Sequence, residues 1–322
     1  MPSKQTTVIR WTGRGRLADL RSSVEFVLAE NRVKAKVAVM GGSVLVIGPR
    51  PIGVTALLGS MPGVSWVAAG MAARSLKEVG GAASLLGSRY LRKGDRFAVE
   101  AEGTKGTTSG DLAGVVTSRI LEAVKGARVS ETPKLRFKAA FDGKGGVVGV
   151  EVKAGVGGVP TGDVPVACLV SGGVHSSVLA WMAMLQGFKV QLVHAEVGEE
   201  SLRAVARLYS ELSHRGDPRQ LSLEVIQGNS VAGALRDYAR AAGMPVFAGF
   251  HATGGRGWAK IQSSLSPLYL MPEERFASEY APLGLRPYEA SVDWGEQGRG
   301  VLRSKRYGEK TADVSGVLDG LR

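Results

Sequence analysis

Cysteine is nearly absent from this chain of 322 residues, in which Cys168 is the single example. One thiol cannot form a disulfide framework or a cysteine-rich zinc site. The four histidines lack the spacing of a zinc-binding helix, and no run of about 18 apolar residues suits a membrane span. The N-terminus has no apolar signal core. We therefore expect a cytoplasmic protein without a membrane partner, a disulfide or a metal centre.

The positive charge is concentrated in the first half of the chain. Residues 1–163 contain 24 lysines and arginines against 13 acidic residues, a net charge of +11, whereas residues 164–322 contain 17 and 16, a net of +1. This asymmetry indicates a nucleic-acid-binding module attached to a neutral domain, although a solvated basic surface would give the same counts. Only 6% of the residues are aromatic, so we expect recognition of RNA backbone and shape rather than base stacking.

The first half has the pattern of two small α+β units. For the first unit, apolar spacing predicts strands at 6–11 and 64–69, helices at 17–31 and 52–58, and two strands within 36–47 around a Gly41-Gly42 turn. For the second, we expect strands at 96–102, 134–141 and 147–153 and a helix at 111–125. The Gly-rich segment 154–162 is expected to be a domain boundary, because so many glycines disfavour an element interior.

The second half alternates apolar strands with helices. Strands are expected at 164–170, 189–194, 222–226 and 245–248, with helices at 176–186, 199–213 and 231–242. Apolar strands that alternate with helices predict a parallel sheet covered on both faces. Beyond residue 249 the pattern weakens to one expected helix at 273–280 and a polar tail with a basic cluster at 303–306.

The strongest local signal is the segment 168–177, Cys-Leu-Val-Ser-Gly-Gly-Val-His-Ser-Ser. It joins a predicted buried strand to a predicted helix. Two glycines allow a tight turn and a close approach to a ligand, and the free N–H groups of a helix start bind anions. The loop has neither the Walker A nor the G-x-G-x-x-G pattern. It is expected beyond a strand C-terminus, where ligands bind in such sheets.

Residues 171–176 resemble the PP-loop of ATP pyrophosphatases, Ser-Gly-Gly-x-Asp-Ser, with His175 at the place of the aspartate. An ordinary glycine-rich turn is the alternative interpretation. Upstream, residues 155–162 resemble the Gly-x-Gly-Gly-(Leu/Val)-Pro-x-Gly end of a THUMP domain, an RNA-binding module, and residues 95–100, 109–124 and 133–137 also fit that module. In this order the motifs make residues 7–291 similar to the tRNA 4-thiouridine synthetases, also called tRNA sulfurtransferases or thiamine biosynthesis proteins.

This resemblance implies an α/β multidomain fold. It places a ferredoxin-like α+β unit at 1–90, a THUMP α/β domain at 91–163 and a doubly wound parallel-sheet PP-loop domain, of the ATP pyrophosphatase (adenine nucleotide alpha hydrolase-like) type, at 164–322. It implies tRNA as the partner, ATP as the nucleotide and, by analogy, a homodimer. Members of this family adenylate a uridine oxygen of tRNA with release of pyrophosphate, and a persulfide sulfur then replaces the AMP.

The expected nucleotide contacts lie in the loop and at two other strand ends. For His194, a buried strand-end histidine is an equal alternative, and His251 belongs to the loop that follows Gly249. The nucleotide contacts are expected at Ser171, Gly172, Gly173, His175, Ser176, Ser177, His194 and Gly249. Phosphate contacts with tRNA are expected from Arg92, Lys93, Arg96, Lys105, Arg119, Lys134, Arg136 and Lys138.

Two departures from the family put catalysis in question. Mg²⁺ prefers oxygen ligands, so His175 is a poor substitute for the PP-loop aspartate. Ala290 and Ser291 stand where relatives carry a sulfur-transfer cysteine, and Cys168 is expected to be a core residue, so sulfur would come from an external donor. Two hypotheses follow: a tRNA-adenylating enzyme, or a catalytically degenerate tRNA-binding or partner protein. An ATP pyrophosphatase that acts on small molecules is disfavoured by the THUMP-like segment.

Overall fold

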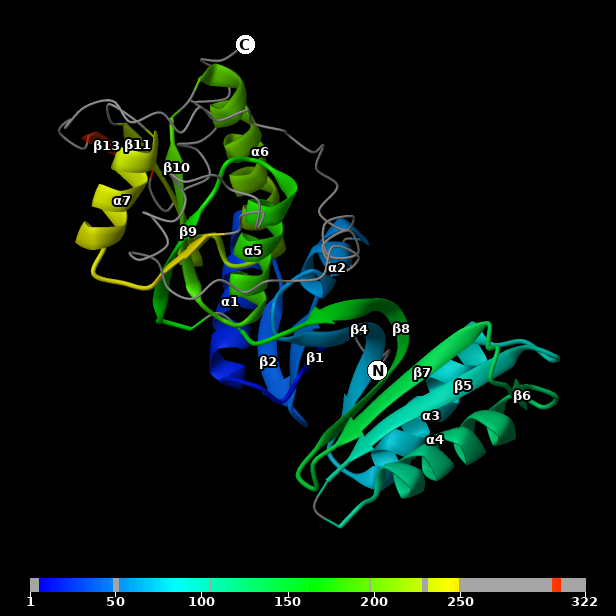
Figure 1. Ribbon diagram of the computed structural model, residues 1–322. Helices are drawn as coiled ribbons and strands as arrows, with labels where there is room; N and C mark the ends of the chain where they lie inside the picture. Colours follow the sequence, from blue (N-terminus) through cyan, green and yellow to red (C-terminus); the bar gives the residue numbers. More distant parts are fainter. Residues whose placement is uncertain are drawn as a thin grey trace. The chain divides into compact units, whose positions relative to one another are not determined.

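The computed structural model describes residues 6–48, 52–104, 106–160, 162–196, 198–227, 231–248 and 303–307. The chain divides into two compact units, Met1–Pro160 and Thr161–Arg322, which are drawn in Figure 1 and are described separately below.

The first unit is built on one eight-stranded sheet with the strand order β2-β3-β1-β4-β8-β7-β5-β6. In chain order its elements are β1 (Thr6–Trp11), α1 (Leu17–Glu30), β2 (Lys36–Met40), β3 (Ser43–Ile47), α2 (Ile52–Gly59), β4 (Val64–Ala73), α3 (Leu76–Tyr90), β5 (Arg96–Gly103), α4 (Ser109–Ala123), β6 (Arg128–Val129), β7 (Leu135–Phe141) and β8 (Gly146–Gly157). The predicted hairpin at 36–47 is confirmed, since β2 and β3 pair antiparallel around Gly41 and Gly42. Both glycines have positive φ, 57° and 65°, as a two-residue hairpin turn requires.

The four helices of this unit pack on the same face of the sheet. One apolar cluster joins α1 and α2 to the strands around β1, and a second joins α3 and α4 to β5, β7 and β8. Strand β4 connects the two clusters, because Val67 belongs to the first and Ala73 to the second, and residues six apart in a strand share a face. The opposite face has its own buried cluster, which contains Val8, Leu45, Trp66 and Val147.

Helix α3 was not predicted, because its three glycines resemble helix breakers. The structure shows why two of them are tolerated: a Cβ on Gly80 would lie 3.1 Å from the side chain of Arg119, and one on Gly87 would lie 3.3 Å from that of Ile120. The glycines therefore let α3 and α4 pack closely. A start signal was present in the sequence, since the Ser75 side chain accepts a hydrogen bond from the Glu78 amide.

Strand β8 extends further than predicted. The Gly-rich segment was expected to lie outside any element, yet the strand continues through Gly157 and pairs with β4. A Cβ on Gly155 would lie 2.1 Å from the carbonyl oxygen of Val64. Glycine is required here by the close approach of another backbone, so the expectation of a loop was wrong for the first part of this segment.

The second unit is a doubly wound sheet, as predicted. Its elements are β9 (Pro165–Leu169), α5 (Val174–Leu185), β10 (Lys189–Ala195), α6 (Glu199–Arg215), a 3₁₀ turn (Pro218–Gln220), β11 (Leu221–Gln227), α7 (Val231–Ala241), β12 (Val246–Ala248) and β13 (Arg303–Tyr307). The strand order is β12-β9-β10-β11-β13, with the first four strands parallel and β13 antiparallel at one edge. The strand β13 was not predicted, because its basic sequence lacks apolar alternation.

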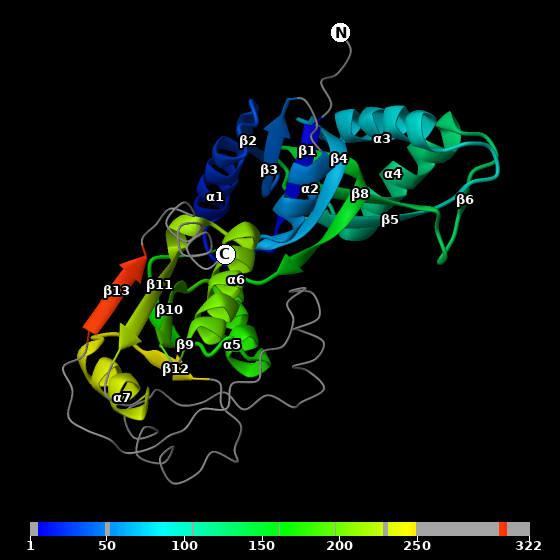
Figure 2. The same cartoon turned by 90° about the horizontal axis from the view of Figure 1, so that it is seen from above.

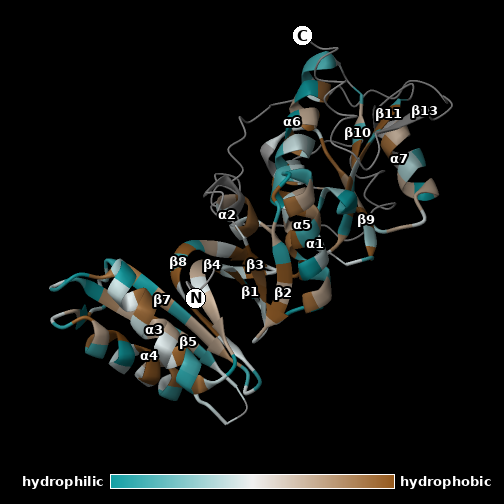
Figure 3. Ribbon diagram, turned by 180° about the vertical axis from the view of Figure 1, so that it is seen from behind, coloured by the Kyte–Doolittle hydropathy of each residue, from teal (hydrophilic) through white to brown (hydrophobic). Residues whose placement is uncertain are grey.

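Helices cover both faces of this parallel sheet. Helix α7 packs on one face through Ala234, Leu235 and Tyr238, and α5 and α6 lie on the other face, as the two views of Figures 1 and 2 show. Segments of α4 and α7 alternate between hydrophobic and hydrophilic colours in Figure 3, which is the amphipathic pattern of helices with one buried face.

Candidate functional site

The predicted loop lies at the point where the strand order of the second unit reverses. From β9 the chain proceeds outward through β10 to β11, and it then returns through α7 to β12 on the other side of β9. In open α/β sheets, ligands bind outside the carboxyl ends of the strands at such a switch point. The loop between Leu169 and Val174 leaves the carboxyl end of β9 at this place.

The backbone of the loop depends on its two glycines. Gly172 has φ +83°, and a Cβ there would lie 2.6 Å from the Cβ of Ala204 on α6. Gly173 is the N-cap of α5 and makes no side-chain cap hydrogen bond. The first N–H groups of a helix have no partner within the helix, so the start of α5 has the donors of an anion site.

Three serines hold the loop in shape. Ser176 Oγ accepts a hydrogen bond from the Ser171 amide at 3.2 Å, and Ser171 Oγ accepts one from the Gly173 amide at 3.3 Å. The Ser177 hydroxyl donates to the Gly173 carbonyl at 2.8 Å. The two hydroxyls of Ser171 and Ser176 lie 3.3 Å apart. The structure therefore brings these predicted loop residues together at one end of α5.

His194 lies at the end of β10 and is 1% exposed. Its Nδ1 lies 2.9 Å from the carbonyl oxygen of Val170, and its Nε2 lies 3.2 Å from Ser201 Oγ. Burial lowers the pKa of His194, with hydrogen bonding to Val170 acting in the opposite direction. Both ring nitrogens thus have protein partners, as expected for the buried strand-end alternative.

Cys168 is 0% exposed inside β9. Burial raises the pKa of its thiol to about 12. A thiol that stays protonated and covered is a poor nucleophile, which agrees with the expected core position.

Several predicted site residues lie outside the described part of the structure. They are Gly249, His251, Lys105, Ala290, Ser291 and the side chain of His175. The helix expected at 273–280 lies there as well.

The predicted RNA contacts fall into two groups. Four of the cations form ion pairs: Arg119 with Glu122, Lys134 with Asp95, Arg136 with Glu100, and Lys138 with Glu100 and Glu151. The hydrogen bond from Lys134 lowers the pKa of Asp95, and that from Lys138 lowers the pKa of Glu100. These cations are therefore partly neutralised by neighbouring carboxylates.

The second group, Arg92, Lys93 and Arg96, forms a basic rim together with two cations that were not predicted, Lys125 and Arg128. All five residues are exposed. They come together because two loops are joined by hydrogen bonds, from the Gly94 amide to the Gly126 carbonyl and from the Arg128 amide to the Asp95 carbonyl, both at 3.0 Å. Lys125 and Arg128 were missed in the sequence, where the only available signal was their position at the end of the helix expected at 111–125 and just after it.

Arg96 and Arg128 are paired in register on the parallel strands β5 and β6. Two like charges on adjacent strands repel each other unless an anion lies between them. This arrangement supplies positive charge at the end of the sheet where β6 is labelled in Figure 1.

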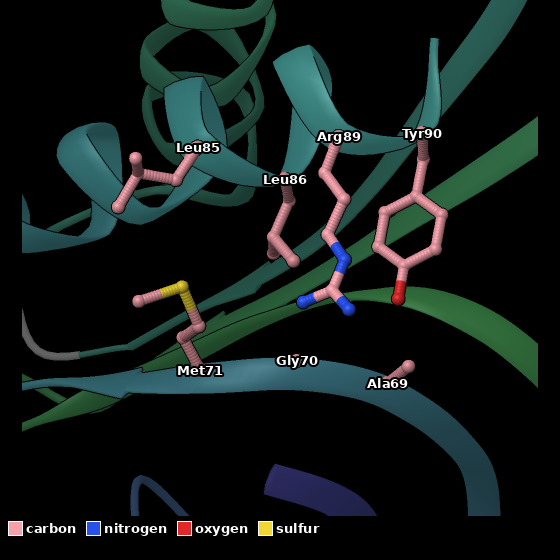
Figure 4. Close-up of a pocket in the computed structure, with 7 residues that line it drawn as sticks. All are labelled: Ala69, Gly70, Met71, Leu85, Leu86, Arg89 and Tyr90. Carbon is pink, nitrogen blue, oxygen red and sulfur yellow. The ribbon is translucent and has the colours of Figure 1, made fainter. Parts of the chain in front are cut away.

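A cavity of about 170 Å³ lies between α3 and β4 in the first unit. Figure 4 shows the Arg89 guanidinium extending from α3 toward the strand, close to the Tyr90 hydroxyl and opposite Gly70. The rest of the cavity is lined by the apolar residues Ala69, Met71, Leu85 and Leu86. The Arg89 guanidinium carbon also lies 5.5 Å from the centre of the Tyr90 ring, which is a cation–π contact.

Two absences hold for the described ranges. Within them, no three His, Cys, Asp or Glu side chains are placed to hold a metal ion. No helix in the described part of the chain is both long and apolar enough to cross a membrane.

The doubly wound sheet and the glycine-rich loop together have the architecture of a PP-loop-type domain, which follows a larger α+β unit. The family model described as "Thiamine biosynthesis protein (ThiI)" matches residues 162–250. A tRNA sulfurtransferase from Pyrobaculum aerophilum is 37% identical over 109 residues, which are 33% of this chain and 22% of that protein. A probable tRNA sulfurtransferase from Aeropyrum pernix is 30% identical over 126 residues, 39% of this chain and 32% of that protein.

Solved structures support the same fold over most of the chain. PH1313 from Pyrococcus horikoshii has a TM-score of 0.64 at 18% identity and covers 87% of this chain and 100% of its own. A 4-thiouridine synthetase–RNA complex with bound ATP has a TM-score of 0.63 at 15% identity and covers 88% of this chain and 85% of its own. The family model and the two curated sulfurtransferases confirm the resemblance to the tRNA 4-thiouridine synthetases over part of the chain, and the two solved structures show that the shared fold extends over most of it. The aligned segments span only about a fifth to a third of the curated relatives.

Proposed function

We propose that this protein binds tRNA through its first unit and ATP through the loop at residues 171–173, and that it adenylates a uridine of the tRNA. The observation that carries this proposal is the position of the loop, at the switch point of the sheet and at the start of α5. The family relationship, and a fold shared with a synthetase solved with RNA and ATP, support the choice of ligands.

The proposed chemistry has two steps. A uridine carbonyl oxygen attacks the α-phosphorus of ATP, the bond from that phosphorus to the bridging oxygen breaks, and pyrophosphate leaves. Sulfide then attacks the uridine carbon that carries the adenylated oxygen. AMP leaves with that oxygen and with the electron pair of the broken C–O bond. No redox change is needed when the donor delivers sulfide.

The loop would act on the first step. Charge develops on the departing pyrophosphate, and fixed N–H and hydroxyl donors stabilise such charge without reorganising. Ser171 and Ser176 are already oriented by hydrogen bonds to loop backbone atoms. Hydroxyls and an imidazole are a poor ligand set for Mg²⁺, so the residues present do not fit a protein-held magnesium ion and no step is assigned to one.

The sulfur would come from outside this chain. Its one cysteine, Cys168, is covered by the sheet, and residues 290 and 291 are alanine and serine. An external donor of sulfide is therefore part of the proposal.

The tRNA would contact the basic rim. Exposed cations that meet phosphates release counterions, which makes binding steeply dependent on salt. The ion-paired cations Lys134, Arg136 and Lys138 contribute less in this proposal, because a phosphate must compete with their carboxylate partners.

A second candidate is a catalytically degenerate protein that binds tRNA and uses the nucleotide domain as a scaffold or partner surface. Two sequence observations favour it: His175 replaces the PP-loop aspartate, and the sulfur-transfer cysteine is missing.

Pyrophosphate release from ATP by the purified full chain, with and without unmodified tRNA, separates the two candidates. The enzyme should release pyrophosphate only with tRNA, and Ser171→Ala or Gly173→Val should abolish release while tRNA binding persists. Intact tRNA binding without release would reject adenylation and support the scaffold. Absence of salt-sensitive tRNA binding would reject both.

A further inference from the structure

His194 joins three parts of the second unit that meet at the loop. It lies one residue before the end of β10, its Nδ1 contacts the carbonyl of Val170, and its Nε2 contacts Ser201 in the first turn of α6. Val170 immediately precedes the loop serine Ser171. The ring therefore connects the last residue before the loop to the helix behind it.

The proton positions follow from the partners. A carbonyl oxygen can only accept, so Nδ1 carries the proton that binds Val170. The Ser201 hydroxyl has one proton, which it donates to the Gly198 carbonyl at 2.8 Å, and its Oγ lies 3.2 Å from Nε2. The Gly198 carbonyl also accepts the Leu202 amide at 3.2 Å. Burial lowers the pKa of His194, which favours the neutral ring.

Helix α6 also touches the loop directly. The Cβ of Ala204 lies where a Cβ on Gly172 would be only 2.6 Å away, so the helix leaves no spare room beside the loop backbone. A shift of α6 relative to β9 would change the position of the Gly172 peptide, and the link through His194 opposes such a shift.

We infer that His194 is a positioning residue for the nucleotide loop. Its Nδ1–H fixes the Val170 carbonyl, and Ser201 fixes the orientation of the ring. The hydrogen-bonded frame then keeps the amides around Gly173 in the arrangement that receives a polyphosphate. The effect on ATP rests on the proposed function, whereas the effect on loop geometry does not.

Two substitutions separate the ring contacts. In His194→Asn, the side-chain amide nitrogen occupies the place of Nδ1 and can still donate to Val170. In His194→Gln, the amide nitrogen occupies the place of Nε2, and the Val170 carbonyl loses its donor. Ser201→Ala, which is a smaller change, removes the hydroxyl beside Nε2 together with the hydrogen bond that it donates to the Gly198 carbonyl.

The measurements are amide hydrogen exchange of peptides that contain residues 170–174 in the ligand-free full chain, and the Kd for ATP of each variant. Loss of one buried hydrogen bond changes an equilibrium by up to about tenfold. We expect His194→Gln to speed exchange and weaken ATP binding by about that factor, with Ser201→Ala between it and wild type. His194→Asn should stay close to wild type, and the thermal midpoints of the variants check that all are folded.

Equal loop exchange in the Asn and Gln variants, or no change in either, would overturn the inference. If the wild type binds no ATP but the Gln variant still frees the loop, the positioning role stands and the nucleotide proposal fails. If ATP binds equally well to all variants and loop exchange is unchanged, the nucleotide proposal stands and the positioning role fails.

Discussion

Arg10 and Glu102 form an ion pair of 2.9 Å although three strands separate β1 from β5 in the sheet. Four strand spacings in a flat sheet would separate their backbones by about 19 Å. The two side chains cannot span that distance, so the sheet is curved, and the ion pair closes the gap between β1 and β5. The indole nitrogen of Trp66 donates to the same carboxylate at 3.3 Å, and the Arg10 guanidinium also donates to the Gly41 carbonyl.

We expect Glu102→Ala to destabilise the first unit by roughly 1–2 kcal/mol, since it leaves the Arg10 guanidinium without its anion. The effect is small because the Glu102 side chain is 48% exposed, so that water screens the pair. Glu122→Ala is a matched control, since it removes a pair in which both side chains are more than half exposed, and it should cost less than about 0.5 kcal/mol. Urea unfolding of both variants measures this, and equal losses would contradict the closing role of Glu102.

Gly172→Ala should disrupt the nucleotide loop. The change adds the cost of a positive φ, about 1–2 kcal/mol, to that of a close contact with Ala204, about 1–3 kcal/mol. Gly243→Ala provides the control, because Gly243 also has positive φ but a Cβ there meets nothing within 4 Å. Both variants should lose stability, and only Gly172→Ala should lose ATP binding by more than tenfold. Equal ATP affinity in the two variants would place the nucleotide elsewhere.

Charge reversal of Arg96 and Arg128 should weaken tRNA binding and make it less sensitive to salt. Each lost phosphate contact lowers the slope of log K against log salt by about one unit or slightly less. Arg207→Glu on α6 is a control of the same chemistry at another exposed position. Filter binding at several salt concentrations provides the slopes. Parallel slopes for the wild type and the double variant would exclude the basic rim as the RNA contact.

Cys168 should resist alkylation by iodoacetamide at pH 8 in the folded protein and react after denaturation. Its pKa is raised from the ordinary value of 9.0 to about 12, so folded-state stability from this group is full below about pH 9 and is lost as pH rises toward 12. Cys168→Ala should remove that part of the alkaline loss. If alkylation of the native protein is fast, or if the substitution abolishes sulfur transfer, the core role is wrong.

His175→Asp should increase affinity for Mg·ATP, because it supplies the carboxylate expected in the PP-loop pattern. His175→Asn is the neutral control and should not increase it. Calorimetric titration of the three proteins with ATP and Mg²⁺ compares them. Weaker binding by the aspartate variant would mean that His175 itself contacts the phosphates.

Much of the fold followed from local sequence, and the failures share a cause. The strand–helix alternation of the second unit and the Gly41-Gly42 hairpin depend on residues close together in the chain, and both were predicted. Helix α3 and the end of β8 were missed because their glycines make room for parts of the chain that are distant in sequence. These parts are helix α4 for α3 and the backbone of Val64 for β8. The residues next to a glycine in the sequence do not show whether it ends a helix or strand or whether it allows another element to pack closely against it.

The candidate site also has parts that the sequence predicts and parts that it does not. The loop from Ser171 to Ser177 is contiguous, so its motif was visible in the sequence. The basic rim joins loops about 30 residues apart through the Gly94–Gly126 hydrogen bond, and the frame around His194 joins two strand ends to a helix start. Their assembly depends on tertiary packing, which residue patterns do not specify.

Strand β4 pairs with β8 from Val64 to Ala73, and this pairing makes the first unit indivisible. A fragment ending near residue 90 would contain β4 but not its partner, so a long row of N–H and C=O groups would face the solvent. Unprotected sheet edges of this kind promote aggregation. A chain shortened from its C-terminal side to about Pro160 would keep this sheet complete. A chain cut after α3 would instead expose an unpaired strand edge that promotes aggregation.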